Sequence, residues 1–316
     1  MSYLLAMALA LALDALLGWP ARLYARIGHP VTWIGGLIVA LDRRFNEPSR
    51  SDGQRRFRGL AVALAVIGLC AGLAAGLMAL LPDNPLGTLA LGVLAWPLVA
   101  VRSMHDHVAA VAVPLAAGDL PGARHAVSMI VGRDPARLDA AGVARAATES
   151  LAENTSDGIV APLFWGALLG LPGIAAYKAI NTLDSMIGHR TPRHEAFGWA
   201  AARIDDLVNL LPARLTGLLF ALASARPGAA LRCMARDARH HRSPNAGWPE
   251  AAMAGALGIR LSGPRIYGTR VAQEPWVNGG APDPAPGDLM VALRLYRRAM
   301  WLCGALLLLP GLIAVL

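Results

Sequence analysis

The side chains best suited to chemistry in this 316-residue chain gather in three polar clusters. In the first, Glu149 and Glu153 lie four residues apart in an alanine-rich, proline-free stretch that predicts a helix over 139–153. Residues four apart share one helix face. Asn154 and Asp157 follow, directly before an apolar run, where carboxylates are costly unless they are paired or bind a cation. The spacing therefore allows either a reaction site or a solvated acidic helix face.

The second cluster occupies 177–214 and begins with a polar stripe on a helix. Lys178, Asn181 and Asp184 recur at helical spacing and should lie on one face. Lys178 is the single lysine among 29 basic residues. A lysine ammonium is a compact charge suited to a phosphate oxygen, whereas arginine presents a wide planar fork. The alternative is that Lys178 snorkels to lipid headgroups.

A basic corner is expected directly after that helix. Gly188 should end the helix, and His189 and Arg190 come next. Together with Arg193 and His194 they make a positively charged turn, which favours phosphate or carboxylate groups.

Two adjacent aspartates close the second cluster. Asp205, Asp206 and Asn209 are expected to open the next helix, with Arg203 beside them. Because Mg²⁺ takes carboxylate oxygens, the pair is similar to ligands for Mg²⁺ and phosphate. The alternative is an acidic first turn, which the helix dipole favours.

The third cluster is basic and spans 235–257. Arg236 and His240 precede Ser243, a candidate helix N-cap, and Asn245 follows. The adjacent His240 and His241 could suggest a metal site, but no further ligand follows at the spacing that zinc sites use. The cluster is therefore interpreted as a patch that binds anions.

The elements that hold these clusters are predicted to be membrane helices. Apolar residues make up 55% of the chain, charged residues 16%, and mean hydropathy is +0.46. A soluble domain has about 25% charged residues, so the composition indicates an all-α, multi-pass membrane protein. The net charge of +8 favours anionic partners, but no nucleic-acid-binding pattern is present.

Crossing a bilayer takes about 20 apolar residues. The runs expected to span are 1–19, 59–81, 85–101 and 299–316. Two interrupted runs, 158–177 and 207–225, are expected to re-enter or lie inside protein. The arginine-rich connections should face the cytoplasm. The chain would then form a single integral membrane domain, 1–316, with these polar catalytic segments on the cytoplasmic side: 102–157, 178–206 and 226–298.

Two connecting segments carry structural expectations of their own. Residues 154–157 should end one helix, with Ser156 or Asp157 capping the next at Gly158. The stretch 262–288 is rich in proline and glycine and is expected to be irregular and exposed.

Together the clusters resemble the adenosylcobinamide-phosphate synthase family of cobalamin biosynthesis, the CobD/CbiB proteins. The resemblance covers nearly the whole chain, and it rests on these blocks: LDALLGWP, GHPVTWIG, RDPARLD, GVARAATESLAENTSDGIVAPLFW, YKAINTLDSMIGHRTPRHEAFGWAAARIDDLVNLLPAR and HRSPNAGWPEAAMAGALG. The family often has an acidic residue before the proline of the first block, where this chain has Trp19.

The resemblance implies an enzyme of the bacterial inner membrane whose active face is cytoplasmic. It implies an ATP-dependent amide ligase that joins aminopropanol, as its O-phosphate, to a carboxyl of adenosylcobyric acid. ATP and Mg²⁺ are the implied cofactors, and the corrinoid is a substrate rather than a prosthetic group. Membrane lipid, other cobalamin-biosynthesis enzymes and a second copy of the chain are the other expected partners; nucleic acid is not.

The same resemblance suggests roles for the clustered residues. A carboxylate must be activated before an amine attacks it, and a base must free the attacking ammonium. The residues expected to be catalytic are Glu149, Glu153, Lys178, Asp184 and His189. Those expected to bind cofactor are Asn154, Asp157, Asn181, Arg190, Arg203, Arg236, His240 and Asn245. The candidate Mg²⁺ ligands are Asp157, Asp205 and Asp206.

Two other classes of protein would use similar features. A membrane transferase with Asp-bound Mg²⁺ should show two separated Asp-rich motifs, whereas only Asp205 and Asp206 are adjacent here. A transporter or sensor would place charges inside spanning helices, often with internal repeats. Most charges here lie outside the apolar runs.

Overall fold

The computed structural model describes residues 1–131, 135–267 and 270–313. It is 75% helical, and the described strands form only two short pairs. Arg133 and Asp134 of the RDPARLD block, and 314–316 of the expected span 299–316, lie outside the described residues. The all-α, multi-pass architecture expected from composition is confirmed.

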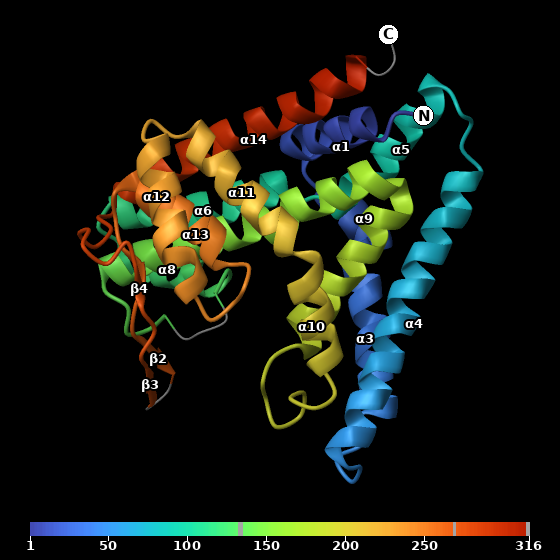
Figure 1. The fold of residues 1–316 in the computed structure, drawn as a ribbon, viewed down its shortest axis with the longest axis horizontal. Helices are drawn as coiled ribbons and strands as arrows, with labels where there is room; N and C mark the ends of the chain where they lie inside the picture. Colours follow the sequence, from blue (N-terminus) through green and yellow to red (C-terminus); the bar gives the residue numbers. More distant parts are fainter. Residues whose placement is uncertain (132–134, 268–269, 314–316) are drawn as a thin grey trace. The chain divides into compact units, whose positions relative to one another are not determined.

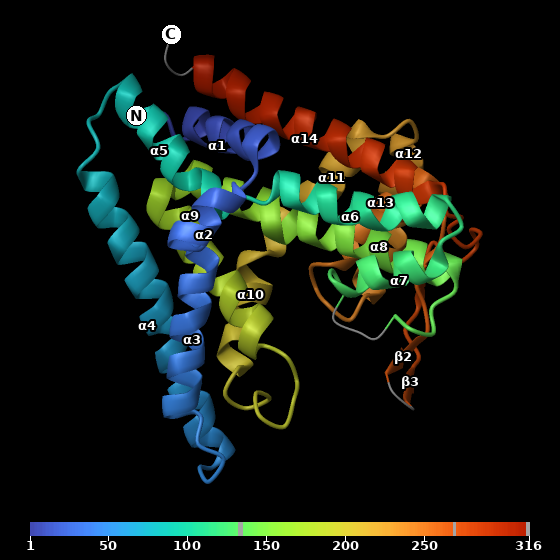
Figure 2. The ribbon, with the colours of Figure 1, turned by 180° about the vertical axis from the view of Figure 1, so that it is seen from behind.

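The chain divides into two compact units, whose helices are labelled in Figures 1 and 2. Unit 1 comprises Met1–Ala100, Ala161–Asn209 and Ala305–Leu316, and unit 2 comprises Val101–Val160 and Leu210–Gly304.

Unit 1 is built around α9, which packs against α1, α3, α4, α5 and α10. Its helices are α1 Tyr3–Leu17, α2 Ala21–Ile27, α3 Pro30–Phe45, α4 Asp52–Ala79, α5 Pro85–Ala95, η1 Trp96–Leu98, α9 Ala161–Ile187 and α10 Trp199–Val208, with the end of α14 Asp288–Ile313. Both views show α3 and α4 side by side (Figures 1 and 2).

The apolar core of unit 1 explains why these helices hold the polar clusters in place. Ile38, Val66, Leu183 and Phe197 are buried together where α3, α4, α9 and the start of α10 meet. Where these helices lie in lipid, close van der Waals packing rather than exclusion from water holds such side chains together. At Gly59 the backbone of α4 passes so close to Phe197 that an added Cβ would lie 1.8 Å from the Phe197 carbonyl oxygen. The loop before α10 is therefore held against α4.

Unit 2 packs α8 against α6, α7 and α13, and α11 against α12 and α13. Its elements are α6 Val101–Ala116, α7 Leu120–Ser128, α8 Ala140–Thr155, η2 Ser156–Val160, α11 Leu210–Ala223, α12 Pro227–Asp237, η3 Ala238–His240, α13 Gly247–Leu257, β1 Leu261–Ser262, β2 Arg265–Tyr267, β3 Arg270–Ala272 and β4 Trp276–Val277, with the first part of α14. The stretch 262–288 is thus less irregular than expected, because β1 pairs with β4 and β2 with β3, both antiparallel.

The expected end of a helix within 154–157 is confirmed, since α8 ends at Thr155, but the expected cap of a new helix at Gly158 is wrong. Helix α8 begins as predicted, with the Asp139 side chain accepting a hydrogen bond from the Gly142 N–H at 2.7 Å. At its other end it passes directly into the π-helical turn η2, and neither Ser156 nor Asp157 caps a new helix. The Thr155 hydroxyl instead donates to the Leu151 carbonyl at 2.6 Å, so this polar side chain is satisfied within the helix.

Helix α9 is kinked inside its apolar run. Gly170 has φ 66° and ψ −149°, a backbone conformation open to glycine but costly for other residues. Pro172 follows two residues later and donates no backbone hydrogen bond. These two residues account for the break within 158–177.

Four helical stretches within the described residues are long and apolar enough to cross a membrane: Asp52–Ala79, Pro85–Ala116, Ala140–Ile187 and Asp288–Ile313. Two bent pairs would raise that number to six: Tyr3–Leu17 with Ala21–Phe45, and Trp199–Val208 with Leu210–Ala223. Helix α1 alone is about 22 Å long at 1.5 Å per residue, which is shorter than the bilayer core of about 30 Å. The run 1–19 therefore qualifies only together with the helices that follow it, across a bend of 107°.

Candidate functional site

The most distinctive polar group of unit 1 is the buried carboxylate of Asp205. Its side chain is 8% exposed, and its Oδ2 accepts a hydrogen bond from the Asn209 amide at 3.0 Å. Asn209 in turn accepts one from the Tyr177 hydroxyl at 2.9 Å. Asp205 Oδ1 makes no hydrogen bond of normal length among the described residues, although the Asn181 side chain lies close enough to this carboxyl to act as a weak donor. An unsatisfied buried carboxylate oxygen is costly, so it points to a ligand.

Asp205 and Asp206 do not open a helix, contrary to the sequence expectation. They lie near the C-terminal end of α10, and α11 begins only after Asn209. The negative end of the helix dipole disfavours carboxylates there, so the acidic-first-turn alternative is excluded. These aspartates are held against the local field of their own helix.

Other members of the second cluster gather around this carboxylate. The side chain of Asn181 lies beside Asp205, and the carboxylates of Asp184 and Asp206 are close enough to interact with it electrostatically. Helix α9 ends before Gly188, as predicted. The Asp184 side chain lies against this glycine, because a Cβ added at Gly188 would lie 2.0 Å from Asp184 Oδ1. His189 is exposed but close enough to Asp184 for their charges to interact.

Lys178 is buried, with 8% of its surface exposed. A lysine that snorkels to headgroups keeps its ammonium at the surface. The burial of Lys178 therefore speaks against the snorkelling alternative and places the ammonium among the side chains of the protein.

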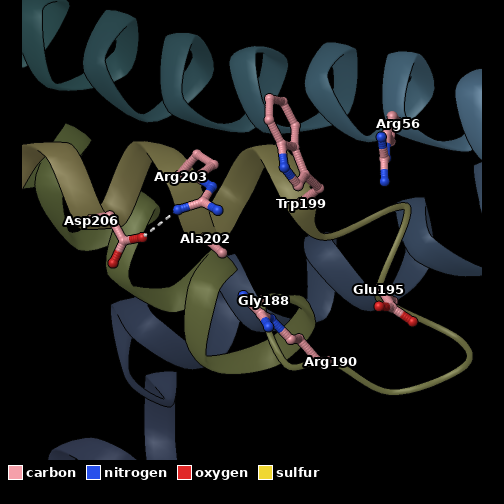
Figure 3. A pocket seen from close by; sticks show the side chains of 8 residues that line it. All are labelled: Arg56, Gly188, Arg190, Glu195, Trp199, Ala202, Arg203 and Asp206. Atoms are coloured by element: carbon pink, nitrogen blue, oxygen red, sulfur yellow. Dashed lines mark hydrogen bonds and ion pairs between the residues drawn. The ribbon is translucent and has the colours of Figure 1, made fainter. Parts of the chain in front are cut away.

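A cavity of about 240 Å³ opens beside this cluster, between the first turns of α4, the loop 188–198 and α10 (Figure 3). Arg190, Arg203 and Asp206, all expected site residues, line it. The guanidinium of Arg203 pairs with Asp206 at 3.4 Å, drawn as a dashed line in Figure 3. The cavity also contains Arg56 and Trp199, which sequence reasoning missed because nothing local marks them.

In unit 2 the two glutamates of α8 have different surroundings. Glu149 is 6% exposed and accepts a hydrogen bond from the Ser262 N–H at 2.7 Å. The Ser262 hydroxyl donates to the buried Glu250 at 3.2 Å, and the His241 ring lies 3.6 Å from Glu250. Glu153, by contrast, is exposed. The solvated-face alternative therefore fails for Glu149, although the two residues share a helix face.

Asn154 and Asp157 are half-buried in unit 2, and their surroundings differ. The Asn154 amide donates to the Ser150 carbonyl at 2.9 Å, within its own helix. Asp157 lies in the π-helical turn η2. Glu250 and Ser262 were missed by sequence reasoning, because a buried acid looks like a surface acid until its neighbours are known.

The third cluster is split by the fold. Arg236 donates two hydrogen bonds of 2.7 Å to Asp237, which also accepts from the Asn278 N–H at 2.7 Å. The Arg236 guanidinium lowers the pKa of Asp237 below its usual range. His240 is exposed in η3, and Asn245 is buried in the turn just before α13. Arg236 thus has a structural partner within unit 2.

Within the described residues, no three side chains of His, Cys, Asp and Glu are grouped closely enough to hold a metal ion by themselves. Mg²⁺ differs from zinc because it keeps several waters and uses one or two carboxylates together with substrate phosphates. Asp205, with its unsatisfied Oδ1, and Asp206 fit that kind of donor set.

The chain matches the family model described as CobD/Cbib protein over residues 7–296. It is 67% identical to the cobalamin biosynthesis protein CobD of Rhodobacter capsulatus, over 100% of this chain and 99% of the relative. The Sinorhizobium sp protein of the same name is 52% identical over 87% of this chain and 88% of its own length. The Brucella suis protein of the same name is 46% identical over 99% of this chain and 98% of its own length. No solved structure matches the chain.

The match extends across both units and includes the residues of all three polar clusters. The chain therefore belongs to the CobD/CbiB family of cobalamin biosynthesis proteins.

Proposed function

We propose that this protein is an ATP-dependent amide ligase of the inner membrane that joins aminopropanol O-phosphate to a carboxyl of adenosylcobyric acid. Family membership along nearly the whole chain supports a role in cobalamin biosynthesis. The observation that carries the proposal is the buried carboxylate of Asp205, which has an unsatisfied oxygen and lies among two further aspartates.

The chemistry needs phosphoryl transfer before amide formation. The substrate carboxylate would take the γ-phosphoryl group of ATP and release ADP, and the amine would then displace phosphate from the acyl phosphate. Such transfers depend on positioned charges more than on covalent chemistry by the protein. A site of carboxylates and cations without a nucleophilic serine or cysteine fits that requirement.

Asp205 and Asp206 would hold Mg²⁺, which when bound would offset the negative charge of the phosphate groups. Arg190 and Arg203 supply fixed positive charge beside them. Lys178 adds a buried ammonium in the same unit, on the helix that carries Asp184. These residues would bind and orient anionic groups and keep water out of the reaction.

The amine attacks only after it loses a proton. His189 is exposed just after α9, close enough to Asp184 for their charges to interact, and is the candidate proton acceptor. Glu149 lies in unit 2, where Ser262 holds it. We keep it as the alternative base. A cytoplasmic active face would give both groups access to soluble ATP.

The test uses purified protein in detergent or nanodiscs with adenosylcobyric acid, aminopropanol phosphate and Mg-ATP. We expect a corrinoid product with the mass of the amide, and one ADP per product. Omission of ATP should abolish the product, and the Asp205→Asn substitution should lower its formation at least about 100-fold. No corrinoid conversion by folded wild-type protein would contradict the proposal and favour a membrane transferase or a transporter.

A further inference from the structure

Helix α14 carries three arginines that the proposed function does not use. Arg294, Arg297 and Arg298 are exposed, and among the described residues none of them makes an ion pair or a side-chain hydrogen bond. Asp288 is the only acid of this helix, and its carboxylate accepts a hydrogen bond from the Ala285 N–H at 2.8 Å. The rest of the helix therefore carries three positive charges and no negative one.

The three arginines are neighbours on one face of the helix. Arg297 and Arg298 follow Arg294 by three and four residues, and residues at these spacings lie side by side. Like charges placed this way destabilise a helix because they repel each other. An anion over this arginine face would remove the repulsion.

The opposite side of this part of α14 is packed against protein. Tyr296 is 1% exposed, and its hydroxyl donates to the Val101 carbonyl at 2.7 Å. Its ring lies 6.5 Å from that of His105 on α6. The acid next to His105, Asp106, pairs with Arg102 at 3.5 Å. The arginine face therefore points away from these contacts and stays available to a ligand.

The same face becomes apolar further along the helix. Trp301, seven residues after Arg294, is 79% exposed. The exposed leucines that continue this face are Leu308, Leu309 and Leu312. Tryptophan is enriched at membrane–water interfaces, and arginines beside an apolar segment reach the headgroups. The order arginine, tryptophan, leucine thus follows a phospholipid from its headgroup to its acyl chains.

We propose that the arginine face and Trp301 bind the headgroup of an anionic phospholipid, whose acyl chains lie against the leucines that follow. Three cations without an acid select a headgroup with net negative charge, such as phosphatidylglycerol, over zwitterionic phosphatidylcholine. A soluble acidic partner would neutralise the arginines but leave Trp301 and the leucines in water. This lipid site is independent of the proposed reaction.

Native mass spectrometry of the full-length protein, released from a non-ionic detergent, measures the affinity of each lipid. The probes are phosphatidylglycerol and phosphatidylcholine with identical acyl chains. The triple variant Arg294→Gln, Arg297→Gln and Arg298→Gln should bind phosphatidylglycerol at least tenfold more weakly than wild type, or about 1.4 kcal/mol. Its binding of phosphatidylcholine should not change. The corresponding triple lysine variant should bind like wild type, because it keeps the three charges.

A matched control separates this site from the overall charge of the protein. It replaces three exposed arginines outside the candidate spans by glutamine: Arg226, Arg232 and Arg239. Both triple variants lose the same charge, but only the α14 variant should lose affinity for phosphatidylglycerol. An equal loss in both, or no preference for phosphatidylglycerol in wild type, would overturn the proposal.

Two soluble anions, glycerol phosphate and polyglutamate, test other sources of negative charge. Neither should displace the lipid; displacement by either that depends on the α14 arginines would overturn the proposal in favour of a soluble ligand or an acidic protein. The substituted side chains are exposed, so the variants should fold, and thermal unfolding checks this. If the triple glutamine variant does not fold, Arg297→Gln alone should weaken phosphatidylglycerol at least about twofold, its third of the free-energy change. Unchanged binding by that variant would contradict the site.

Discussion

Two buried aspartates of unit 1 have the same local sequence pattern and opposite surroundings. Asp42 on α3 and Asp205 on α10 are 9% and 8% exposed, and each accepts a hydrogen bond from an asparagine four residues later. Asp42 also accepts two hydrogen bonds from Arg193, at 3.0 and 2.6 Å, on its other oxygen. Asp205 has no such arginine, and its Oδ1 is unsatisfied among the described residues.

The difference separates a structural acid from a candidate functional one. Arg55 extends the Asp42 network by donating to Asn46 at 3.0 Å and to the Arg193 carbonyl, so every group there has a partner. Such a satisfied network joins α3 and α4 to the loop 188–198 that borders the cavity. The Asp205 carboxylate keeps an acceptor available, which costs stability unless a ligand uses it.

The largest effect should come from Asp205→Asn. This change keeps the shape of the side chain and removes its charge, so we expect amide formation to fall at least about 100-fold, the loss typical of a charge-stabilising group. Thermal stability should stay the same or rise, because a buried charge without a cation is unfavourable. Product formation and unfolding temperature, measured on the same preparation, check the expected loss of activity and the expected stability. A destabilised variant with normal turnover would mean that Asp205, like Asp42, is a structural acid.

The reciprocal experiment is Asp42→Asn. Loss of the charge-assisted hydrogen bonds should destabilise the protein by about 2 kcal/mol, a moderate value because the Arg193 side chain is 47% exposed. Activity per folded molecule should be retained. Chemical unfolding in detergent measures the first, and turnover normalised to folded protein the second. A strong loss of turnover without destabilisation would mean that Asp42 belongs to the reaction site.

Lys178→Arg asks whether the functional region also depends on a specific cation. A buried ammonium that contacts a phosphate or carboxylate cannot be replaced by a planar fork, so activity should fall about tenfold, or 1.4 kcal/mol of transition-state stabilisation. Turnover is measured at saturating and at limiting ATP. The reverse swap at an exposed site, Arg232→Lys, should have no effect. Full activity of Lys178→Arg at both ATP concentrations would remove the catalytic role.

The smallest effect concerns a third aspartate, Asp237, which lies outside the candidate spans. Like Asp42, it has an arginine partner. Because Arg236 lowers its pKa in the folded state, its contribution is present above the unfolded pKa of about 4 and is lost as pH falls through the folded pKa. Arg236 is 61% exposed, so solvent screens the pair and limits the contribution to less than about 1 kcal/mol. Stability of wild type and Asp237→Asn, compared between pH 6 and pH 3, should converge at the acid end. A constant difference would contradict this linkage.

Several features of the molecule could be predicted from composition and spacing. The excess of apolar residues predicts membrane helices because only helices and closed barrels satisfy the backbone in lipid. The start of α8 near Asp139 and the end of α9 at Gly188 follow from helix propensity and backbone freedom. The clustering of Asp184, Asp205 and Asp206 was anticipated only as part of one polar segment.

Local patterns failed where a side chain's meaning depends on distant neighbours. Asp42 and Asp205 both precede an asparagine by four residues, but only Asp42 meets an arginine, which comes from 151 residues away. Glu149 and Glu153 share a helix face, but only Glu149 is covered by β1. Arg56 and Glu195 reach one cavity from segments that are far apart in the chain.

Residue types and their spacing are sufficient for the helical class, the family resemblance and the inventory of acids and cations, since these depend on local backbone preferences and hydropathy. Packing between helices decides which acid is neutralised by a cation and which keeps an unsatisfied oxygen. It also decides which charges share a cavity. Desolvation and Coulomb energies change steeply over a few ångströms, so only the tertiary structure decides them.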